Sequence, residues 1–257
     1  MVAVQTITAR VSNRLRIYNA VAGLVHLVQA VAVLSLTNDF AIPVTAVFME
    51  GPPGTDATKV TTLFDFSIGW GVAIFLLMSA IAHLLLITPR AFQWYVSQLE
   101  TRRNYARWIE YSLSSSLMVV LIALLPGITD ISALIALFGV NAAMILFGLL
   151  MEKYEQPGNP SWTSYWFGVV SGSVPWIAIA FYLWSPGSIA NPPIFVYVIF
   201  VSLFLFFNSF SLNMILQYRQ TWRWQNYVYG EYVYILLSLT AKSLLAWQIF
   251  AGTLAAP

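Results

Sequence analysis

Residues 232–250 read YVYILLSLTAKSLLAWQIF, an apolar run that contains one charged residue, Lys242. A helix needs about 20 predominantly apolar residues to cross the hydrocarbon core of a bilayer. If this helix begins near Tyr227, Lys242 lies roughly 22 Å along its axis, because each residue adds about 1.5 Å. The run therefore predicts a membrane-spanning helix with a lysine near or past the middle of the membrane.

Six more apolar runs of similar length come before this one, and together they predict seven transmembrane helices. Hydrophobic residues make up 59% of the chain and charged residues only 9%, whereas soluble domains have roughly 25% charged residues. We expect a single seven-helix domain over residues 1–257, with no cleavable signal before it. The predicted helices cover residues 16–36, 63–87, 105–125, 128–151, 162–184, 193–218 and 227–250.

The loops of the predicted bundle differ in charge. If the helices alternate in direction, Lys59 lies on one side and ten other basic residues lie on the opposite side. Cytoplasmic loops carry the excess of Lys and Arg, so we predict a multi-pass plasma membrane protein with a cytoplasmic N-terminus and an extracellular C-terminus. The long first loop then lies outside, and its middle, Ile42–Met49, is expected to form a short β-hairpin. The ten basic residues are Arg10, Arg14, Arg16, Arg90, Arg102, Arg103, Arg107, Lys153, Arg219 and Arg223.

Lys242 is the first candidate functional residue. A lysine at the bilayer centre costs ~2.5–3.5 kcal/mol on insertion scales, so a functional role is the default interpretation. Its amine can form a Schiff base with a carbonyl cofactor. Two alternatives stay open, a lysine that extends to a helix end and a purely structural ion pair.

Glu110 lies in the third predicted helix, within RNYARWIEYSLSSS at residues 103–116. A lone carboxylate at that depth requires a cation, and Lys242 is the only basic residue that we place deep in a span. We predict that the two side chains pair, with Glu110 as the counterion that stabilises a protonated Schiff base. The alternative is a carboxylate at the level of the lipid headgroups, paired with Arg107 three residues earlier.

Several small or polar side chains are predicted near this pair. Both histidines are placed in the cytoplasmic half, and three serines lie four residues from a histidine, from Lys242 or from Glu110, on the same helix faces. Together they are expected to line a small polar cavity, although a single hydrogen bond between helices would also explain each histidine. No metal site is expected, because no helix has a His-x-x-x-His or Glu-x-x-His pattern and the chain has no cysteine. The residues are His26, His83, Ser79, Ser238 and Ser114.

Aromatic side chains are dense in the predicted helices. Five of them are placed inside the bundle, where a flat polyene would fit among the rings, and plain packing is the alternative for any single one. They are Trp176, Phe204, Phe206, Phe207 and Trp247.

Several runs of the chain resemble the heliorhodopsin family, and the resemblance extends over essentially the whole length. These runs are RWIEYSLSSS at 107–116, FGVNAAMILFG at 138–148, FLFFNSF at 204–210, LSLTAKSLLAWQIF at 237–250, and NDFAIP with GPPGT in the first loop. The resemblance implies an all-α, rhodopsin-like bundle of seven helices. It also implies an N-terminus inside the cell, opposite to microbial pump rhodopsins and in agreement with the charge distribution.

The family resemblance further implies a cofactor and partners. It implies all-trans-retinal on Lys242, Glu110 as the sole counterion, and a proton-accepting polar cluster with His26 and His83. The family pocket places Asn141, Met144 and Phe207 near the chromophore. Such proteins are dimers with the first-loop hairpin at the contact. The expected partners are membrane lipid, a second copy of the chain and an unidentified signalling partner, with no nucleic acid.

The residues argue against outward proton pumping by the usual route. Arg107 and Glu110 have the spacing of the Arg-x-x-Asp motif of pump rhodopsins. However, Leu121 stands where those pumps have a donor carboxylate, and Ser238 stands where they have an aspartate four residues before the lysine. We therefore expect one carboxylate in the core of the bundle.

Our hypothesis from the sequence is a light sensor that is not an enzyme. Retinal would isomerise from all-trans to 13-cis, the Schiff-base proton would move within the polar cluster, and a helix shift would signal to a partner. The family resemblance implies a slow photocycle without net transport. Two alternatives stay open, a light-driven or ion-coupled transporter or channel, and a light-dependent regulatory subunit of a soluble enzyme.

Overall fold

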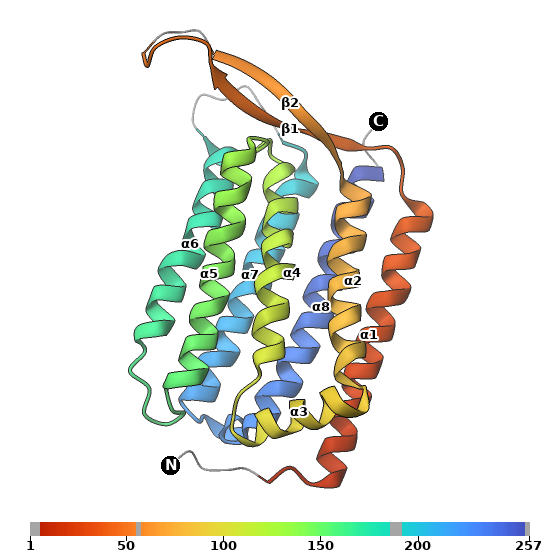
Figure 1. The fold of residues 1–257 in the computed structure, drawn as a ribbon, viewed down its shortest axis with the longest axis vertical. Helices are drawn as coiled ribbons and strands as arrows, with labels where there is room; N and C mark the ends of the chain where they lie inside the picture. Colours follow the sequence, from red (N-terminus) through yellow and green to blue (C-terminus); the bar gives the residue numbers. More distant parts are fainter. Residues whose placement is uncertain (1–5, 55–57, 186–191, 255–257) are drawn as a thin grey trace.

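The computed structural model describes residues 6–54, 58–185 and 192–254. Seven long helices stand side by side, with a two-stranded sheet at one end and a short helix across the other (Figure 1). Each of the seven is long and apolar enough to cross a membrane, which confirms the predicted seven-helix fold. They are α1 (Ala9–Leu36), α2 (Ile68–Leu86), α4 (Tyr105–Leu124), α5 (Ile131–Tyr154), α6 (Thr163–Trp184), α7 (Ile194–Tyr218) and α8 (Tyr227–Leu254).

Polar side chains fix where several of these helices begin. The Asn104 side chain accepts a hydrogen bond from the Arg107 N–H at 3.0 Å, at the start of α4. At the start of α5, Asp130 accepts from the N–H groups of Ser132 and Ala133 at 2.9 and 3.2 Å. Such caps satisfy N–H groups that have no partner within the helix. Asn104 thereby sets the position at which α4 presents its charged side chains.

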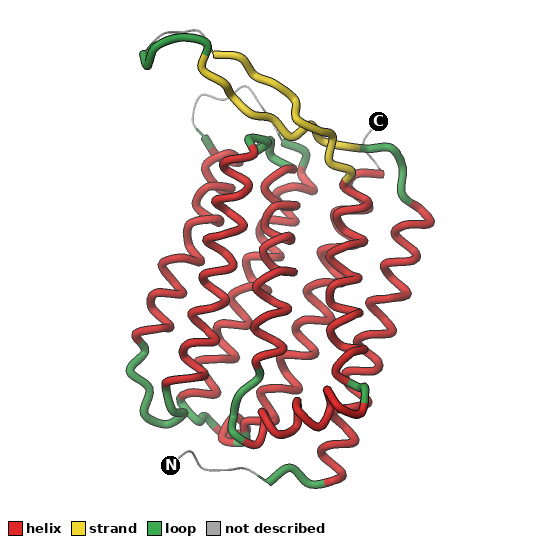
Figure 2. The backbone as a smooth tube through the Cα atoms, viewed as in Figure 1, coloured by secondary structure: helices red, strands yellow, loops and turns green. Residues whose placement is uncertain are grey.

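The first loop forms a β-hairpin, as predicted, but the strands lie elsewhere than expected. Strand β1 (Ala41–Met49) pairs antiparallel with β2 (Thr58–Ser67). The predicted hairpin segment, Ile42–Met49, is therefore a single strand, and the predicted helix start at Leu63 is wrong. The residues of β2 are rich in the β-branched and aromatic types that favour strands, and their apolar members resembled the start of a helix. The hairpin extends beyond the end of the bundle (Figure 2).

The segment after α2, which lies between two helices predicted from the sequence, is itself a helix. Helix α3 (Pro89–Glu100) lies across the end of the bundle that carries the N-terminus (Figure 1). Proline at its first position has a backbone angle already suited to a helix. Tyr95 and Leu99 are buried on one face, whereas Trp94 is exposed. The helix is therefore amphipathic and covers the end of the bundle between α2 and α4.

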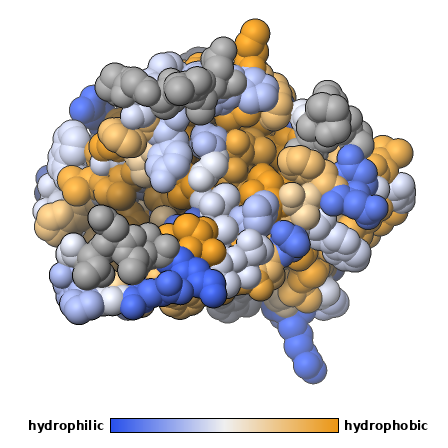
Figure 3. Space-filling model, turned by 90° about the horizontal axis from the view of Figure 1, so that it is seen from above, coloured by the Kyte–Doolittle hydropathy of each residue, from blue (hydrophilic) through white to orange (hydrophobic). Residues whose placement is uncertain are grey.

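The outer surface of the bundle is apolar. Large hydrophobic side chains such as Val28, Ile135, Ile177 and Leu205 are exposed on the spanning helices. Figure 3 views the molecule from the hairpin end and shows hydrophobic residues reaching its periphery. Contiguous apolar surface of this kind is stable when it faces lipid. The protein is an integral, multi-pass membrane protein.

The packing of the helices brings α2, α4 and α8 together. Helix α2 packs against both α4 and α8, and α7 packs against α8. The main apolar core lies toward the hairpin end and includes Val72, Leu76, Leu121 and Ile249. Most of the polar groups with candidate functions lie on these same three central helices, whereas His26 lies on α1 and Asn141 on α5.

Candidate functional site

Lys242 lies at a junction of three helices. Its Nζ is 2.6 Å from Oε1 of Glu110 on α4 and 2.6 Å from Oγ of Ser79 on α2. The Ser79 hydroxyl also donates to Glu110 Oε1 at 2.7 Å. Lys242 and Ser79 are buried. The structure thus brings together three of the residues singled out from the sequence, and Arg107 pairs elsewhere rather than with Glu110.

The two histidines lie next to one another. Their rings stack with centroids 6.1 Å apart, and Nδ1 of His83 is 2.8 Å from Oδ1 of Asn19. Neither ring nitrogen of His26 has a hydrogen-bond partner among the described residues. Ser114 and Ser238 are fully buried on the helices that carry Glu110 and Lys242. Asn19, which orients His83, was missed because an asparagine in an apolar helix has no recognisable motif.

A cavity of about 380 Å³ opens beside Lys242, and Lys242 is part of its wall. Of the predicted pocket residues, Met144, Trp176 and Phe207 line this cavity. Asn141 does not line it, but its amide donates to Ser115, which does, at 2.9 Å. Further aromatic walls come from Phe75, Trp108, Tyr111, Phe204, Phe206 and Phe210. Two residues that the sequence placed inside the bundle are instead exposed: Trp247 is 37% exposed, and Phe204, although it lines the cavity, is 42% exposed.

The cavity fits retinal in size, lining and reactive group. Its volume lies within the roughly 300–1,000 Å³ that is typical of small-molecule sites. Trp176 packs edge-on against Phe204 and Phe207, with ring centroids 5.4 and 5.5 Å apart, which forms an aromatic wall. Glycines keep space free beside it: a Cβ at Gly172 would lie 2.5 Å from Sδ of Met144. If an apolar polyene with a terminal aldehyde occupied this cavity, the amine of Lys242 would lie at the cavity wall.

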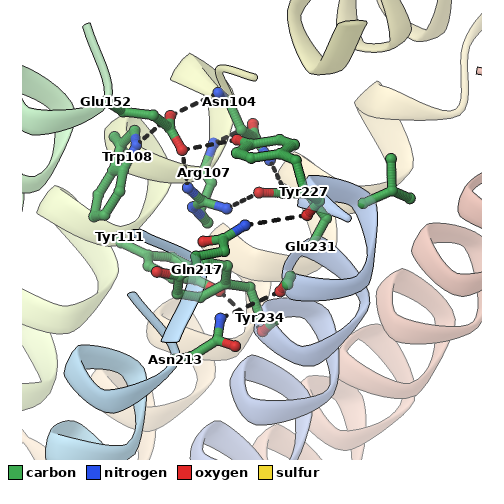
Figure 4. A network of polar contacts seen from close by, with 12 residues as sticks. Asn104, Arg107, Trp108, Tyr111, Glu152, Asn213, Gln217, Tyr227, Glu231 and Tyr234 are labelled. Atoms are coloured by element: carbon green, nitrogen blue, oxygen red, sulfur yellow. Dashed lines mark hydrogen bonds and ion pairs between the residues drawn. The ribbon is translucent and has the colours of Figure 1, made fainter. Parts of the chain in front are cut away.

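A second buried charged cluster lies closer to the N-terminal end of the bundle (Figure 4). Nη2 of Arg107 is 2.5 Å from Oε1 of Glu152 on α5, and Nη1 of Arg107 pairs with Oε1 of Glu231 on α8. All three residues are buried. The expectation of one carboxylate in the core is therefore wrong. Arg107 is also not one of the surface charges among which the sequence analysis counted it.

The sequence analysis missed this cluster for a physical reason. Arg107 lies in the first turn of α4, Glu231 follows the first turn of α8, and Glu152 lies in the last turn of α5. Charged residues so close to helix ends are normally solvated. One signal was present: Glu231 precedes Lys242 by eleven residues, about three turns, and so shares its helix face.

A small cavity of about 30 Å³ lies between the two charged clusters. Glu110 and His83 line it from the lysine side, and Arg107 and Glu231 line it from the other side. A cavity needs roughly 10–15 Å³ and several polar partners to hold one water molecule. This space is large and polar enough for a water molecule that links the two clusters.

Amide side chains of α7 hold the connection to α8 at the same end (Figure 4). This connection contains a short 3-10 helix, η1 (Trp222–Gln225). Nε1 of Trp224 donates to Oδ1 of Asn213 at 2.6 Å, and the amide of Asn213 donates to the Gly230 carbonyl at 3.2 Å. Gln217 donates to the Tyr227 carbonyl at 3.1 Å. The loop is therefore linked through hydrogen bonds to both α7 and the start of α8.

The chain was compared with models of protein families. The heliorhodopsin family model matches residues 15–254, which is nearly the whole chain. A search of curated proteins gives no match.

Proposed function

The chain belongs to the heliorhodopsin family, and from this premise we propose that it is a light-sensing retinal protein with a slow photocycle and no net ion pumping. The family implies a retinal chromophore and a light-responsive membrane protein. We assign all-trans-retinal to the cavity beside Lys242, and we assign no enzymatic activity to the chain.

One observation supports this proposal above the others: the Lys242–Glu110 ion pair stands in a junction next to an aromatic cavity of matching size. Bound to Lys242 as a Schiff base, retinal supplies visible absorption and light-driven isomerisation. Glu110 holds a positive charge at Nζ, because an opposite charge within hydrogen-bonding distance stabilises the protonated form. Ser79 donates to the same carboxylate oxygen and thereby orients it. Ser114, Ser238 and Asn141 complete the polar surroundings on α4, α8 and α5, respectively.

The polar cluster beside the ion pair provides a local proton acceptor. A proton at Nζ is one hydrogen bond from Glu110, and Glu110 shares the small cavity with His83. His26 stacks on His83 and extends the cluster. A proton that moves within this group changes the charge between α2, α4 and α8 without leaving the protein. That change of charge is the proposed origin of the helix rearrangement that signals.

We further propose a cytoplasmic N-terminus and a homodimer that forms through the hairpin. The orientation rests on the excess of basic residues at the N-terminal end. The dimer is supported by exposed apolar side chains on both strands, including Phe48, Val60 and Phe64. A second copy would cover this surface, while the signalling partner would bind at the cytoplasmic end.

A visible spectrum tests the retinal proposal. The protein expressed with all-trans-retinal should have a visible band that hydroxylamine bleaches and that is missing in Lys242→Ala. A colourless wild type would overturn the proposal and redirect attention to the Lys242–Glu110 pair as an ion-coupled transport site. Light-induced pH changes in vesicles then separate a sensor from a pump, since a sustained change would contradict the sensor.

A further inference from the structure

The second charged cluster has an unbalanced formal charge. Arg107 contributes one positive charge, whereas Glu152 and Glu231 would contribute two negative charges if both were ionised. The three residues are only 6%, 6% and 1% exposed. A buried charge without a partner is costly, and a buried carboxyl group commonly takes up a proton instead. The cluster is balanced if one carboxyl group carries a proton.

The two carboxyl groups differ in the number of hydrogen bonds that they accept. Oε2 of Glu152 accepts from the backbone N–H of Asn104 at 2.7 Å and from Nε1 of Trp108 at 2.6 Å. Oε1 accepts from Arg107 at 2.5 Å and from the Tyr227 hydroxyl at 2.7 Å. A carboxylate has about four lone-pair sites, and donors fill all four. Glu152 therefore has no site for a proton.

Glu231 accepts fewer hydrogen bonds than Glu152, and it lies beside the small cavity. It accepts two hydrogen bonds, one at Oε1 from Arg107 and one at Oε2 from the Asn104 amide at 2.7 Å. Two lone-pair sites stay available, and the residue lines the small cavity that also contains Glu110 and His83. A proton on Glu231 can therefore be directed toward a water molecule in this cavity.

The other groups around the cavity do not compensate the charge. Lys242 is paired with Glu110, and the guanidinium of Arg107 lies against the rings of Tyr234 and Trp108, 3.9 and 4.6 Å from their centroids. Burial raises the pKa of Tyr95, so its hydroxyl stays protonated. The titratable groups that face Glu231 are His83 on α2, Tyr95 on α3, Arg107, Glu110 and Tyr111 on α4, Glu152 on α5, and Tyr227 and Tyr234 on α8.

We propose that Glu231 is a second proton-binding site, which is protonated in the dark and exchanges its proton with His83 through water in the small cavity. Asn19 donates its amide to the Leu15 carbonyl, so its Oδ1 accepts from Nδ1 of His83 and leaves Nε2 as the base. On exchange, the O–H bond of Glu231 breaks, the water takes that proton and passes one of its own to Nε2. Glu231 becomes a carboxylate paired with Arg107, His83 becomes a cation, and the total charge is unchanged.

Solid-state NMR of the full-length protein with ¹³C-labelled glutamate carboxyl groups tests the site. The chain has six glutamates, and one carboxyl carbon should have the shift of a protonated acid at neutral pH. The signal should vanish in Glu231→Gln and persist in Glu155→Gln, a matched change at the end of α5. It should be present with and without retinal, so a colourless protein would leave this inference intact.

A ¹⁵N label on the tryptophan indole nitrogens allows a second measurement that needs no glutamate variant. The carboxyl carbon in contact with the Trp108 indole nitrogen belongs to Glu152 and should have the ionised shift, and Trp108→Phe assigns the contact. Three results would overturn the proposal: six ionised carboxylates in the wild type, an acid signal on the carbon that contacts the indole, or an acid signal that survives in Glu231→Gln.

Discussion

Glu231 and Lys242 lie eleven residues apart on α8, and each is bonded to a side chain of α4. Lys242 pairs with Glu110, whereas Glu231 pairs with Arg107. Eleven residues make about three turns, so both side chains leave the same face of α8. Helix α4 therefore cannot slide along α8 without breaking two buried contacts, the Lys242–Glu110 ion pair and the Arg107–Glu231 hydrogen bond.

Removing the Glu110 carboxylate should lower the affinity of Nζ of Lys242 for its proton. In Glu110→Gln, the ratio of protonated to deprotonated chromophore at neutral pH should fall by roughly ten- to a thousandfold, because a neighbouring opposite charge is lost. Absorption spectra should show the visible band replaced by absorption in the near ultraviolet. Glu100→Gln, on α3, should leave the spectrum unchanged. A wild-type spectrum in Glu110→Gln would mean that another group is the counterion.

Two glycines in the cavity wall should differ in how well they tolerate a methyl group. A Cβ at Gly148 would overlap the rigid ring of Trp108, whereas a Cβ at Gly172 meets the flexible side chain of Met144. Gly148→Ala should lower the free energy of unfolding by ~1–3 kcal/mol, the usual cost of overpacking. Gly172→Ala should cost less. Thermal loss of the visible band compares the two, and an equal loss would contradict the assigned packing.

Arg107 should contribute much more to stability than its surface neighbour Arg103. Arg107→Gln leaves buried carboxylate charge without a cation and should cost ~3–5 kcal/mol. Arg103→Gln removes one 3.3 Å hydrogen bond from an exposed side chain and should cost under about 1 kcal/mol. Unfolding of both variants in the same detergent measures the difference. Similar midpoints would show that the cluster is solvated in the membrane.

The loop between α7 and α8 should loosen when Asn213 is truncated. Asn213→Ala leaves the Trp224 indole N–H and the Gly230 carbonyl without their partners, at a cost of ~1–3 kcal/mol. Amide hydrogen exchange over residues 220–230 should become faster. The matched control is Asn208→Ala, because Asn208 is exposed and donates only within its own helix, to the Phe204 carbonyl. Unchanged exchange in Asn213→Ala would show that the loop is held by other contacts.

Charges on the hairpin should disrupt the proposed dimer. Phe48 and Phe64 are 53% and 49% exposed on paired strands, so an acidic residue at either position is tolerated by the fold but not by an apolar contact. Light scattering in detergent should give a monomer for Phe48→Asp with a wild-type visible spectrum. Phe181→Asp, on the outer face of α6, is the control and should stay dimeric. A dimeric Phe48→Asp would place the contact elsewhere.

Length and apolarity were sufficient to predict the seven spans. In lipid the backbone N–H and C=O groups must form hydrogen bonds within the protein, so a long apolar run of this kind forms a helix. The start of α2 was misplaced because Leu63, Phe64 and Phe66 belong to a strand that runs directly into the helix. Helix α3 was missed because its apolar positions are few and separated by polar residues. Local patterns can identify a span, but they cannot mark where a strand of similar composition ends.

The proximity of Lys242 and Glu110 followed from elimination, since few charges lie deep in the helices. The Arg107 cluster did not, because Glu152 and Glu231 come from helix ends far apart in sequence. Such residues resemble headgroup-level charges until packing shows them to be buried. Asn19 and Asn104 were missed for a similar reason, since the role of an amide side chain depends on the hydrogen-bond partner that the folded structure places beside it.

Helix α3 joins the two helices that hold Ser79, His83 and Glu110, with one short connection at each of its ends. Any change in the spacing of α2 and α4 must therefore displace α3, whose exposed face includes Trp94 and whose buried Tyr95 lines the small cavity. An exposed tryptophan at the end of a membrane bundle is typical of the level of the lipid headgroups. The absorption maximum and the photocycle time of the proposed chromophore should consequently depend on the surface charge of the bilayer. The protein would then respond to the lipid composition of its membrane as well as to light.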